Sequence, residues 1–200
     1  MRQDLDKIEF NQRLICFLSG QNTSTISRYM SDKKIPFIEH HGNNRKKYSF
    51  EETRKVIKYF VADQLMVKEK IQVFFNFKGG TGKTSLCHQI AVHLSLLGFK
   101  VLAIDCDPQA HLSSSLGFNE YSDDPTLYDV LINGRLITEA IKQVYPGLDA
   151  IPSNLSMTKV EIPLAQKPNR EKLLLKSLKS LDYDYILLDT NPTISNLNQS

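Results

Sequence analysis

The segment "KGGTGKTS", residues 78–85, follows the apolar run "IQVFFNF" and opens the predicted helix "TSLCHQIAVHLSLLG". A strand that turns through glycines into a helix aims several backbone N–H groups, and the positive end of the helix dipole, at one point in space. A phosphate group suits that point. The segment therefore predicts an α/β fold that binds a nucleotide, and a bland glycine-rich turn is the alternative.

The residues of this loop have different predicted roles. Glycines let the backbone approach a phosphate without Cβ atoms in the way, Lys83 can reach the β and γ phosphates of ATP, and the Thr84 hydroxyl can ligate Mg²⁺. The full phosphate-loop pattern also has glycine five residues before Gly82, where this chain has Phe77. The residues predicted to bind the nucleotide are Gly79, Gly80, Thr81, Gly82, Lys83, Thr84 and Ser85.

From residue 71 onward, predicted strands and helices alternate. The strands are "IQVFFNF", "KVLAID", a short one in "LDAIPSN", and "YDYILLD", and a further helix is "REKLLLKSLKSL". Strand, helix, strand at this spacing is a βαβ unit, which predicts a parallel open sheet. The nearly continuous apolar run "IQVFFNF" predicts a strand covered on both faces.

Three carboxylates stand at the ends of predicted strands, at the edge where ligands of open α/β sheets gather. Asp105 and Asp107 share a face at the end of the second strand, and Asp189 ends the last strand. A lone aspartate at a strand end is otherwise a helix cap or a turn former. The glycine loop and the two strand ends that carry these aspartates, in this order along the chain, favour a functional site over helix caps and turns.

The segment "KGGTGKTS" resembles the deviant Walker A motif of the ParA-type partition ATPases, in which a second, signature lysine stands where Lys78 stands. The resemblance implies an ATP-dependent homodimer in which Lys83 serves the chain's own ATP and Lys78 serves its partner's. Two cations would neutralise charge on the transferred phosphoryl group, one of them arriving only on dimerisation. The alternative for Lys78 is a solvated loop lysine.

Further motifs extend the resemblance over about residues 70–192. "VLAIDCDPQ" is similar to Walker A′, which implies that Asp107 orients the attacking water and that Asp105 supports the Mg²⁺ shell or the loop geometry. "YILLD" resembles Walker B, which implies that Asp189 holds Mg²⁺ through water. Asn191 replaces the first of two prolines usual in the family, whereas "TLYDVL" and "IPSN" are family-like in position.

The first 70 residues are more basic than the rest. They hold 14 Lys and Arg against 9 Asp and Glu, whereas residues 71–200 hold 11 against 13. "NQRLICFLS" predicts a helix that Gly20 ends, and "TSTISRYMS" predicts a second helix capped by Thr23 or Ser24. The apolar stripe of the first helix comprises Leu14, Ile15, Phe17 and Leu18. Helix, three-residue turn, helix is the helix-turn-helix pattern.

A polar hairpin and a third helix follow. Residues 35–39 and 46–48 predict two extended limbs around the turn "HGNN", and Ser49 with Glu52 predicts a capping box that opens the helix "FEETRKVIKYFVADQLMV". This region resembles the MerR-like winged helix-turn-helix. The residues that this resemblance places on DNA are Ser24, Thr25, Ser27, Arg28, Arg45, Lys46 and Lys47. The alternative is a helical cap or a dimerisation module.

Composition excludes several classes. No apolar run approaches the roughly 18 residues of a membrane helix, so we expect a soluble intracellular protein. Cys16, Cys87 and Cys106 show no CxxC spacing, which predicts reduced thiols and disfavours an iron–sulfur reductase. His88 and His93 lie five residues apart rather than four, so histidine metal sites are not expected.

Together, these features predict a winged helix-turn-helix domain over residues 1–68 and the N-terminal part of a ParA-type ATPase domain over residues 69–200. The resemblance implies a cytoplasmic, nucleoid-associated partition ATPase that uses ATP and Mg²⁺, binds operator and nonspecific DNA, represses its own operon and meets a ParB-like centromere-binding protein. The alternative is a nucleotide-responsive transcriptional repressor without a segregation role. A MinD-like membrane ATPase is disfavoured because no C-terminal amphipathic helix is seen. The few predicted strands suggest a fragment with weak ATPase activity or none.

Overall fold

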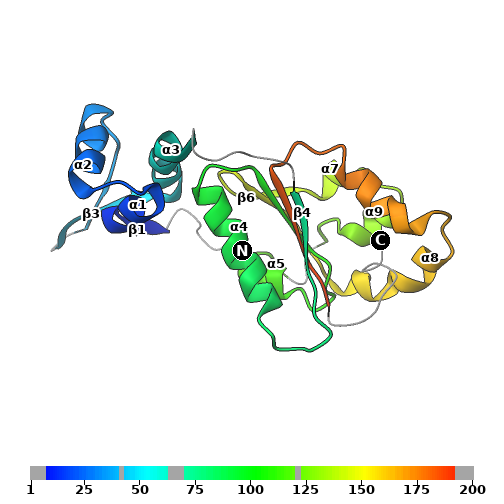
Figure 1. The fold of residues 1–200 in the computed structure, drawn as a ribbon. Coiled ribbons are helices and arrows are strands. Elements are labelled where there is room, and N and C mark those ends of the chain that lie inside the picture. Colours follow the sequence, from blue (N-terminus) through cyan, green and yellow to red (C-terminus); the bar gives the residue numbers. More distant parts are fainter. Residues whose placement is uncertain (1–7, 41–42, 63–69, 120–122, 192–200) are drawn as a thin grey trace.

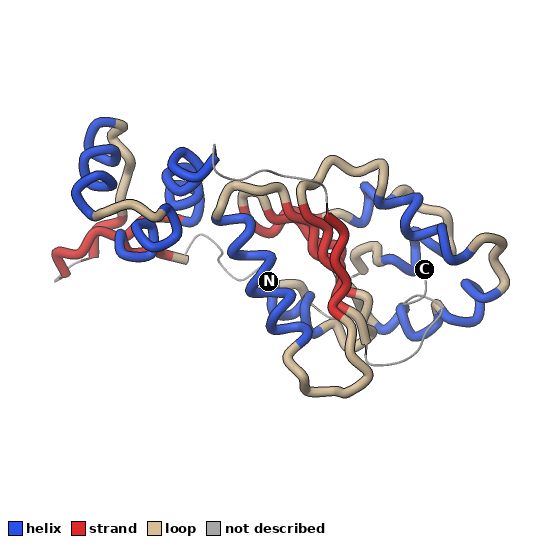
Figure 2. The backbone as a smooth tube through the Cα atoms, in the orientation of Figure 1, coloured by secondary structure: helices blue, strands red, loops and turns tan. Residues whose placement is uncertain are grey.

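The structure is a computed structural model that describes residues 8–40, 43–62, 70–119 and 123–191 (Figure 1). It forms an N-terminal module, residues 8–61, followed by an α/β unit around a five-stranded sheet (Figure 2). None of the described helices is long and apolar enough to cross a membrane. The predicted domain boundary at 68/69 lies outside the described residues.

Helices and strands of the N-terminal module are β1 (Glu9–Asn11), α1 (Gln12–Ser19), α2 (Thr23–Asp32), β2 (Ile38–His40), β3 (Asn43–Ser49) and α3 (Phe50–Val61). Those of the α/β unit are β4 (Lys70–Phe74), α4 (Lys83–Leu96), β5 (Val101–Asp105), α5 (His111–Ser115), α6 (Leu127–Leu131), α7 (Ile137–Ala140), β6 (Lys142–Tyr145), β7 (Leu148–Ile151), the 3₁₀ helix η3 (Leu155–Lys159), α8 (Glu161–Ala165), α9 (Arg170–Leu178) and β8 (Tyr185–Asp189).

The two predicted helices are present as α1 and α2, but the predicted cap of α2 is wrong. Gly20 ends α1 in the left-handed conformation, at φ 67°. The Asn22 side chain, rather than Thr23 or Ser24, accepts the free backbone N–H of Thr25 at 2.8 Å. Thr23 is already the first helical residue, and the Ser24 hydroxyl donates to Asn22 Oδ1 at 2.7 Å.

The predicted apolar stripe of α1 is wrong at one position. Ile15 is fully buried, whereas Phe17 is 82% exposed. Two residues along a helix correspond to a rotation of roughly 200°, so these two side chains point in opposite directions. The core of the module instead combines α1, α2, β3 and α3 through Ile15, Ile26, Met30, Tyr48, Val56, Ile57 and Val61.

The predicted hairpin is present as the antiparallel pair β2 and β3. Its first limb begins at Ile38 rather than at residue 35. The Ile35 N–H donates to the Met30 carbonyl at 2.9 Å and Pro36 has no N–H, so neither residue can donate to a neighbouring strand. A strand that the sequence did not predict, β1, pairs with the other side of β3. The Ser49 hydroxyl accepts the Glu52 N–H at 3.3 Å and caps α3, which is one half of the predicted capping box, whereas the Glu52 carboxylate accepts from Lys55 at 3.1 Å. Residues 63–67 of the predicted helix lie outside the described residues.

The sheet of the α/β unit has the strand order β4-β8-β5-β7-β6. The pairs β4–β8, β8–β5 and β5–β7 are parallel, which confirms the predicted parallel open sheet. The unpredicted strand β6 pairs antiparallel with β7. The parallel register brings the ends of β5 and β8 together, with Asp105 opposite Asp189.

Two helical layers cover the sheet (Figure 1). Along β5, Leu102 and Ile104 pack with α6, α7, α8 and α9, whereas Val101 and Ala103 pack with α4 and α5. Successive residues of a strand point to opposite faces, so a strand covered on both sides is apolar throughout. The three cysteines are free thiols, as predicted, with Cys87 and Cys106 buried.

The strand β4 contradicts the prediction that it is covered on both faces. It lies at the edge of the described sheet, where Ile71 is 42% and Val73 is 51% exposed, and only Phe74 is buried. An apolar run shows that a strand is hydrophobic, but it does not show how many strands pair with it. The sequence pattern therefore could not distinguish an edge strand from a central one.

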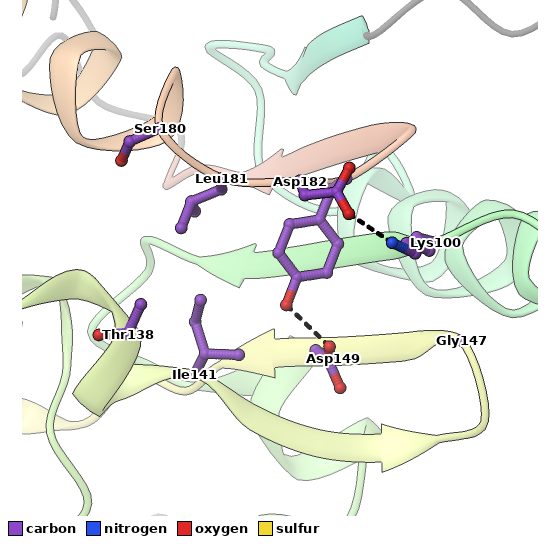
Figure 3. Close-up of a pocket in the computed structure, with 9 residues that line it drawn as sticks. Lys100, Thr138, Ile141, Gly147, Asp149, Ser180, Leu181 and Asp182 are labelled. Atoms are coloured by element: carbon purple, nitrogen blue, oxygen red, sulfur yellow. Dashed lines mark hydrogen bonds and ion pairs between the residues drawn. The ribbon is translucent and has the colours of Figure 1, made fainter.

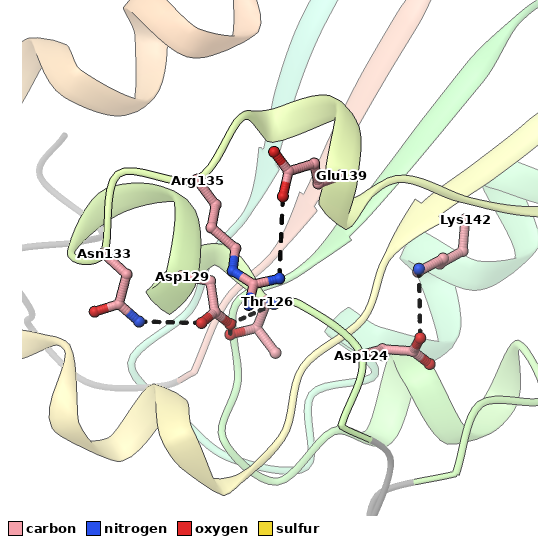
Figure 4. A network of polar contacts seen from close by, with 7 residues as sticks. All are labelled: Asp124, Thr126, Asp129, Asn133, Arg135, Glu139 and Lys142. Atoms are coloured by element: carbon pink, nitrogen blue, oxygen red, sulfur yellow. Dashed lines mark hydrogen bonds and ion pairs between the residues drawn. The ribbon is translucent and has the colours of Figure 1, made fainter.

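The family-like segment "TLYDVL" begins a short, firmly capped helix (Figure 4). The Thr126 hydroxyl accepts the Tyr128 N–H at 3.2 Å, and the Thr126 N–H donates to Asp129 Oδ2 at 3.0 Å. Burial favours the protonated form of Asp129, but hydrogen bonds from Thr126 and Asn133 and the charge of Arg135 lower its pKa overall. The segment thus fixes α6 beside the sheet.

Candidate nucleotide-binding site

The predicted phosphate loop connects β4 to α4, as the sequence indicates. Gly80 and Gly82 have φ angles of 70° and 81°, values that side chains with a Cβ rarely adopt. A Cβ added at Gly79, Gly80 or Gly82 would meet no atom within 4 Å. The backbone of the loop is therefore curved, with free space next to these three glycines.

Helix α4 begins in this loop without a side-chain cap. Gly82 is its N-cap residue and makes no capping hydrogen bond with a side chain. The first N–H groups of an α-helix have no partner within the helix. Those of Lys83, Thr84 and Ser85 begin α4 in this position, where the helix dipole favours an anion.

The two lysines of the loop differ in their surroundings. Lys83 and Thr84 are half-buried in the first turn of α4, whereas Lys78 is exposed at the start of the loop. The Lys78 backbone is held in place, because its N–H donates to Asn76 Oδ1 at 3.0 Å and its carbonyl accepts the Thr81 hydroxyl at 3.3 Å. The Lys78 side chain extends from an ordered turn.

Asp189 lies at the end of β8 with a buried carboxylate. The residue is 1% exposed, and neither carboxylate oxygen accepts a hydrogen bond of good geometry. Burial raises the pKa of Asp189, and the Asp107 charge adds to this increase. The nearby Thr84 hydroxyl and the charges of Lys83 and His111 oppose it. These residues therefore gather at one end of the sheet.

Asp105 is also 1% exposed, but both of its oxygens accept hydrogen bonds. Oδ1 accepts the Asp107 N–H at 3.0 Å, and Oδ2 accepts the Ser113 N–H at 2.8 Å and the Ser113 hydroxyl at 2.7 Å. Burial raises the pKa of Asp105 to about 6, against the effect of these hydrogen bonds, and the Asp189 charge contributes to the increase. This carboxylate organises the loop after β5.

Asp107 lies in that loop and is half-buried. Its Oδ1 accepts the Gln109 N–H at 2.9 Å, and its carbonyl accepts the Ala110 N–H at 2.9 Å. Ala110 has a φ of 54°, an uncommon conformation for a residue with a Cβ. The turn holds Asp107 near Asp189, close enough for their charges to interact.

The sequence analysis missed two residues at this site, Ser113 and His111. Ser113 bridges two buried groups, since its hydroxyl donates to Asp105 and accepts the Ser153 N–H at 2.8 Å. Ser113 and Leu112 are the two buried residues of α5. A buried polar side chain needs a hydrogen-bond partner, so a serine next to an apolar residue on this short helix was the signal that the sequence offered. For His111 the sequence carried no comparable signal.

The residues predicted to contact DNA lie in the N-terminal module. Arg28 is exposed on α2, where the Ser24 hydroxyl is bound to Asn22 and the Ser27 hydroxyl accepts Gln12 Nε2 at 2.7 Å. Thr25 is half-buried on the same helix. On β3, the exposed Lys46 lies over the Phe37 ring, and Lys47 lies 4.0 Å from Glu9. The Arg45 side chain lies outside the described part of the structure.

A pocket of about 570 Å³ lies at the opposite end of the sheet (Figure 3). Most of the residues that line it precede β5, β7 or β8, whereas Asp149 lies within β7 and Thr138 in α7. Two contacts join four of its polar side chains: Tyr183 to Asp149 at 2.7 Å, and Lys100 to Asp182. Ligands of open α/β sheets bind at the carboxyl ends of the strands. The candidate site is therefore the glycine loop and not this pocket.

No group of three or more His, Cys, Asp or Glu among the described residues could hold a metal ion by itself. Mg²⁺ that accompanies a nucleotide uses phosphates, waters and one or two protein oxygens. The Thr84 hydroxyl lies beside the buried Asp189 carboxylate, which accepts no hydrogen bond of good geometry, and this arrangement fits that requirement.

These features define a class of protein: an α/β phosphate-loop NTPase fold with a mostly parallel five-stranded sheet, preceded by a small module of helices and strands. The chain belongs to the family described as "AAA domain", whose model matches residues 69–200. Its relatives include a chromosome partitioning protein ParA and the sporulation initiation inhibitor protein Soj of Bacillus subtilis.

Two relatives illustrate the similarity. The cell division protein PomZ of Myxococcus xanthus is 42% identical over 130 residues, which cover 64% of this chain and 41% of PomZ. The chromosome partitioning protein ParA of Caulobacter vibrioides is 35% identical over 131 residues, which cover 63% of this chain and 49% of that protein. The matched part of the chain thus spans less than half of these relatives.

Two solved structures share the fold. A cobyrinic acid a,c-diamide synthase from Mycobacterium smegmatis, with a bound ATP analogue and magnesium, has a TM-score of 0.61 and 27% identity over 66% of this chain and 55% of that chain. A plasmid partition protein from Borrelia burgdorferi has a TM-score of 0.55 and 31% identity over 66% of this chain and 59% of that chain.

Proposed function

We propose that this chain binds ATP with Mg²⁺ and hydrolyses it as part of a ParA-type system that segregates plasmid or chromosomal DNA. The observation that carries the proposal is an open glycine loop at an uncapped helix end, beside a buried carboxylate that accepts no hydrogen bond of good geometry and has only the Thr84 hydroxyl and the charges of Lys83 and His111 near it. Buried polar groups in folded proteins almost always have well-formed hydrogen bonds, so one without them near a helix N-terminus suggests a missing ligand.

Each residue of the loop has a role in this proposal. The N–H groups from Gly80 to Thr84 surround the phosphates, and Lys83 neutralises the β and γ phosphates. Gly79, Thr81 and Ser85 shape the two sides of the loop. The similarity to the synthase with a bound ATP analogue and magnesium supports this assignment. A preorganised set of backbone donors favours a phosphoryl group over water.

Thr84 and Asp189 would hold Mg²⁺, which when bound neutralises charge on the phosphates. The Asp189 carboxylate is buried near the Thr84 hydroxyl and accepts no hydrogen bond of good geometry, so the group fits the residues present. Asp107 orients the attacking water from the adjacent turn. The three hydrogen bonds accepted by Asp105 favour its role in loop geometry over direct contact with the metal shell.

Lys78 acts across an ATP-dependent homodimer in this proposal. Its side chain is exposed on a turn fixed by Asn76 and Thr81, so it is free to reach a second subunit. A cation that arrives only on dimerisation couples assembly to hydrolysis.

The N-terminal module binds operator DNA as a winged helix-turn-helix and represses the operon. Support comes from the helix-turn-helix pair α1 and α2, the hairpin β2–β3 and the exposed Arg28 and Lys46. Ser24, Thr25 and Ser27 lie on α2 with Arg28, and Arg45 and Lys47 lie on β3 with Lys46. The ATPase dimer also binds nonspecific DNA, and a ParB-like protein stimulates its hydrolysis in the nucleoid-containing cytoplasm.

Calorimetry of ATP binding in the presence of Mg²⁺ tests the nucleotide site. We expect Lys83→Ala to abolish detectable binding and Lys78→Ala to keep it, with loss of the ATP-dependent dimer in light scattering. Lys172→Ala, an exposed lysine on α9, is the matched control and should bind as the wild type does. Wild-type affinity in the Lys83→Ala protein would refute the proposed site.

Binding of an operator duplex at several salt concentrations tests the DNA proposal. Each lost phosphate contact should reduce the magnitude of the slope of log K against log salt by about 1. We expect this change for Lys46→Ala and not for Lys176→Ala on α9. Equal slopes for both variants would favour a helical cap or a dimerisation module.

A further inference from the structure

The Arg54 side chain crosses from the N-terminal module to the α/β unit. Its Nε donates to the Ser95 carbonyl at 2.9 Å, and its Nη2 donates to the Gly98 carbonyl at 2.9 Å and the Phe99 carbonyl at 3.3 Å. The last carbonyls of a helix lack partners within it and carry the negative end of the helix dipole. A guanidinium is therefore well suited to this place, where its donors bind the Ser95 carbonyl in the last turn of α4 and the Gly98 and Phe99 carbonyls in the turn that follows.

Two glycines make room for this contact. A Cβ at Gly147, in the turn between β6 and β7, would lie 2.5 Å from Arg54 Nη2. A Cβ at Gly98 would lie 2.7 Å from Lys58 Cγ. A Cβ at Gly98 would press on Lys58 close to the α3 backbone, and a Cβ at Gly147 would displace the Arg54 guanidinium, so both turns leave room for the contact with α3.

An apolar contact lies beside the polar one. Phe50 of α3 stacks on Tyr145 of β6, with ring centroids 4.7 Å apart and an interplanar angle of 9°. Phe50 is 4% and Tyr145 is 7% exposed, and Phe50 belongs to the hydrophobic cluster of the α/β unit rather than to that of its own module. The two parts of the chain thus share a core.

Charge and burial agree with this contact. Burial lowers the pKa of Arg54, and the negative charge of Asp184 opposes that change. Taking a guanidinium partly out of water is unfavourable unless it is hydrogen-bonded, and here three carbonyls accept from it. The nearby exposed Lys55 instead pairs with Glu51 and Glu52 on its own helix.

We propose that the N-terminal module is docked on the turns after α4 and β6 as one cooperative body with the α/β unit, and that Arg54 is the residue that fastens it. The module is then held at the end of α4 opposite the phosphate loop, roughly 21 Å away along the helix. The contact uses no residue of the loop, so the proposal stands whether or not a nucleotide binds there. Two units joined only by a linker are the alternative.

Hydrogen exchange of the full chain without nucleotide, followed by mass spectrometry, tests the proposal. The Leu97, Gly98 and Phe99 amides are hydrogen-bonded within the end of α4, so they exchange only when that end opens. We expect Arg54→Ala to accelerate exchange over residues 95–99 at least about tenfold, and exchange of α3, β5 and β8 to rise together, because one cooperative body is destabilised as a whole. Arg54→Lys, with one cationic donor group in place of a planar fork, should lie between.

Lys55→Ala is the matched control, since it removes an exposed cation from the same helix, and it should leave residues 95–99 unchanged. Unchanged exchange in both Arg54 variants would overturn the proposal. If the Arg54→Ala protein does not fold, urea unfolding of the wild type tests the proposal instead. In a urea series, amides of α3 and of β5 must lose protection at one midpoint, and two separate midpoints would contradict a single cooperative body.

Discussion

The ends of β5 and β8 carry two aspartates that lie side by side and have opposite surroundings. Asp105 and Asp189 are paired in register, and each is 1% exposed. Asp105 accepts three hydrogen bonds, whereas neither oxygen of Asp189 accepts a hydrogen bond of good geometry. The comparison separates a carboxylate that serves the fold from one that is left for a ligand.

The same contrast divides the two ends of α4. Its first turn begins at Gly82 with no side-chain cap, beside the open loop. Its last turn is closed by Arg54 from the N-terminal module. Groups with partners hold the molecule together, and groups without them mark the place where phosphate and Mg²⁺ are proposed to bind.

The largest effect that tests this comparison is on pH-dependent stability. The folded-state pKa of Asp105 is about 6, above its ordinary value of 3.8, so the folded state binds more protons than the unfolded state between these values. Stability should therefore fall as pH rises from 4 to 6 and then level off, by up to about 3 kcal/mol from this group. Asp105→Asn should remove this component.

Urea unfolding of the wild type and Asp105→Asn at pH 4, 5, 6 and 7 measures it. Because other carboxyls titrate in both proteins, the quantity to compare is the difference between their free energies of unfolding. A difference that stays constant over this range would mean that Asp105 is not held as described.

The next effect concerns Asp189. Asp189→Asn should reduce the Mg²⁺-dependent gain in ATP affinity by roughly 10- to 100-fold, the usual cost of losing a residue that acts on a metal through water. Its free energy of unfolding should not fall, because the unfavourable burial of the Asp189 charge outweighs its interactions with Thr84, Lys83 and His111. Calorimetry with Mg²⁺ or EDTA measures the first quantity, and the exposed Asp182→Asn is the control. If Asp189→Asn left the Mg²⁺-dependent gain in ATP affinity unchanged, the contrast drawn between Asp105 and Asp189 would be wrong.

A smaller effect should follow from the support of Asp105. Ser113→Ala removes a buried hydroxyl that bonds both Asp105 and the Ser153 N–H, which should cost about 2 kcal/mol of unfolding free energy. Ser115→Ala on the same helix removes an exposed hydroxyl bonded only to the His111 carbonyl, and should cost less than about 0.5 kcal/mol. Chemical denaturation measures both, and equal losses would contradict the buried bridge.

The smallest effect distinguishes the loop glycines. Gly82→Ala should lower the free energy of unfolding by about 1 kcal/mol, because its φ of 81° strains a residue with a Cβ. Gly79 has no positive φ and open space around a Cβ, so Gly79→Ala should change stability by less than about 0.5 kcal/mol. Thermal unfolding of both variants checks this, and similar losses would argue against the strained loop.

The features that sequence could predict are local. The loop, α4, β5, β8 and the helix-turn-helix pair follow from periodicity and glycines, which act over a few residues. The caps are less certain from sequence, because Asn22, Thr23 and Ser24 can all cap a helix and only the register of α2 selects Asn22. The short strands β1 and β6 carry too few residues for a periodic signal.

What sequence could not predict depends on contacts between distant residues. The apolar run of β4 did not show that it is an edge strand, because neighbours in a sheet are set by topology. Asp105 and Asp189 look alike in sequence, and only the return of Ser113 to the end of β5 makes them different. In the sequence, Arg54 looks like any exposed cation on a helix, and only the fold brings the end of α4 next to it.

The central claim is that the backbone N–H groups at the start of α4 receive a triphosphate. Amide NMR of the labelled chain titrated with Mg²⁺ and ATP measures this directly. We expect the largest shifts at the amides of residues 80–84. Unperturbed loop amides, with the largest shifts instead around Lys100 and Tyr183 at the opposite end of the sheet, would contradict it.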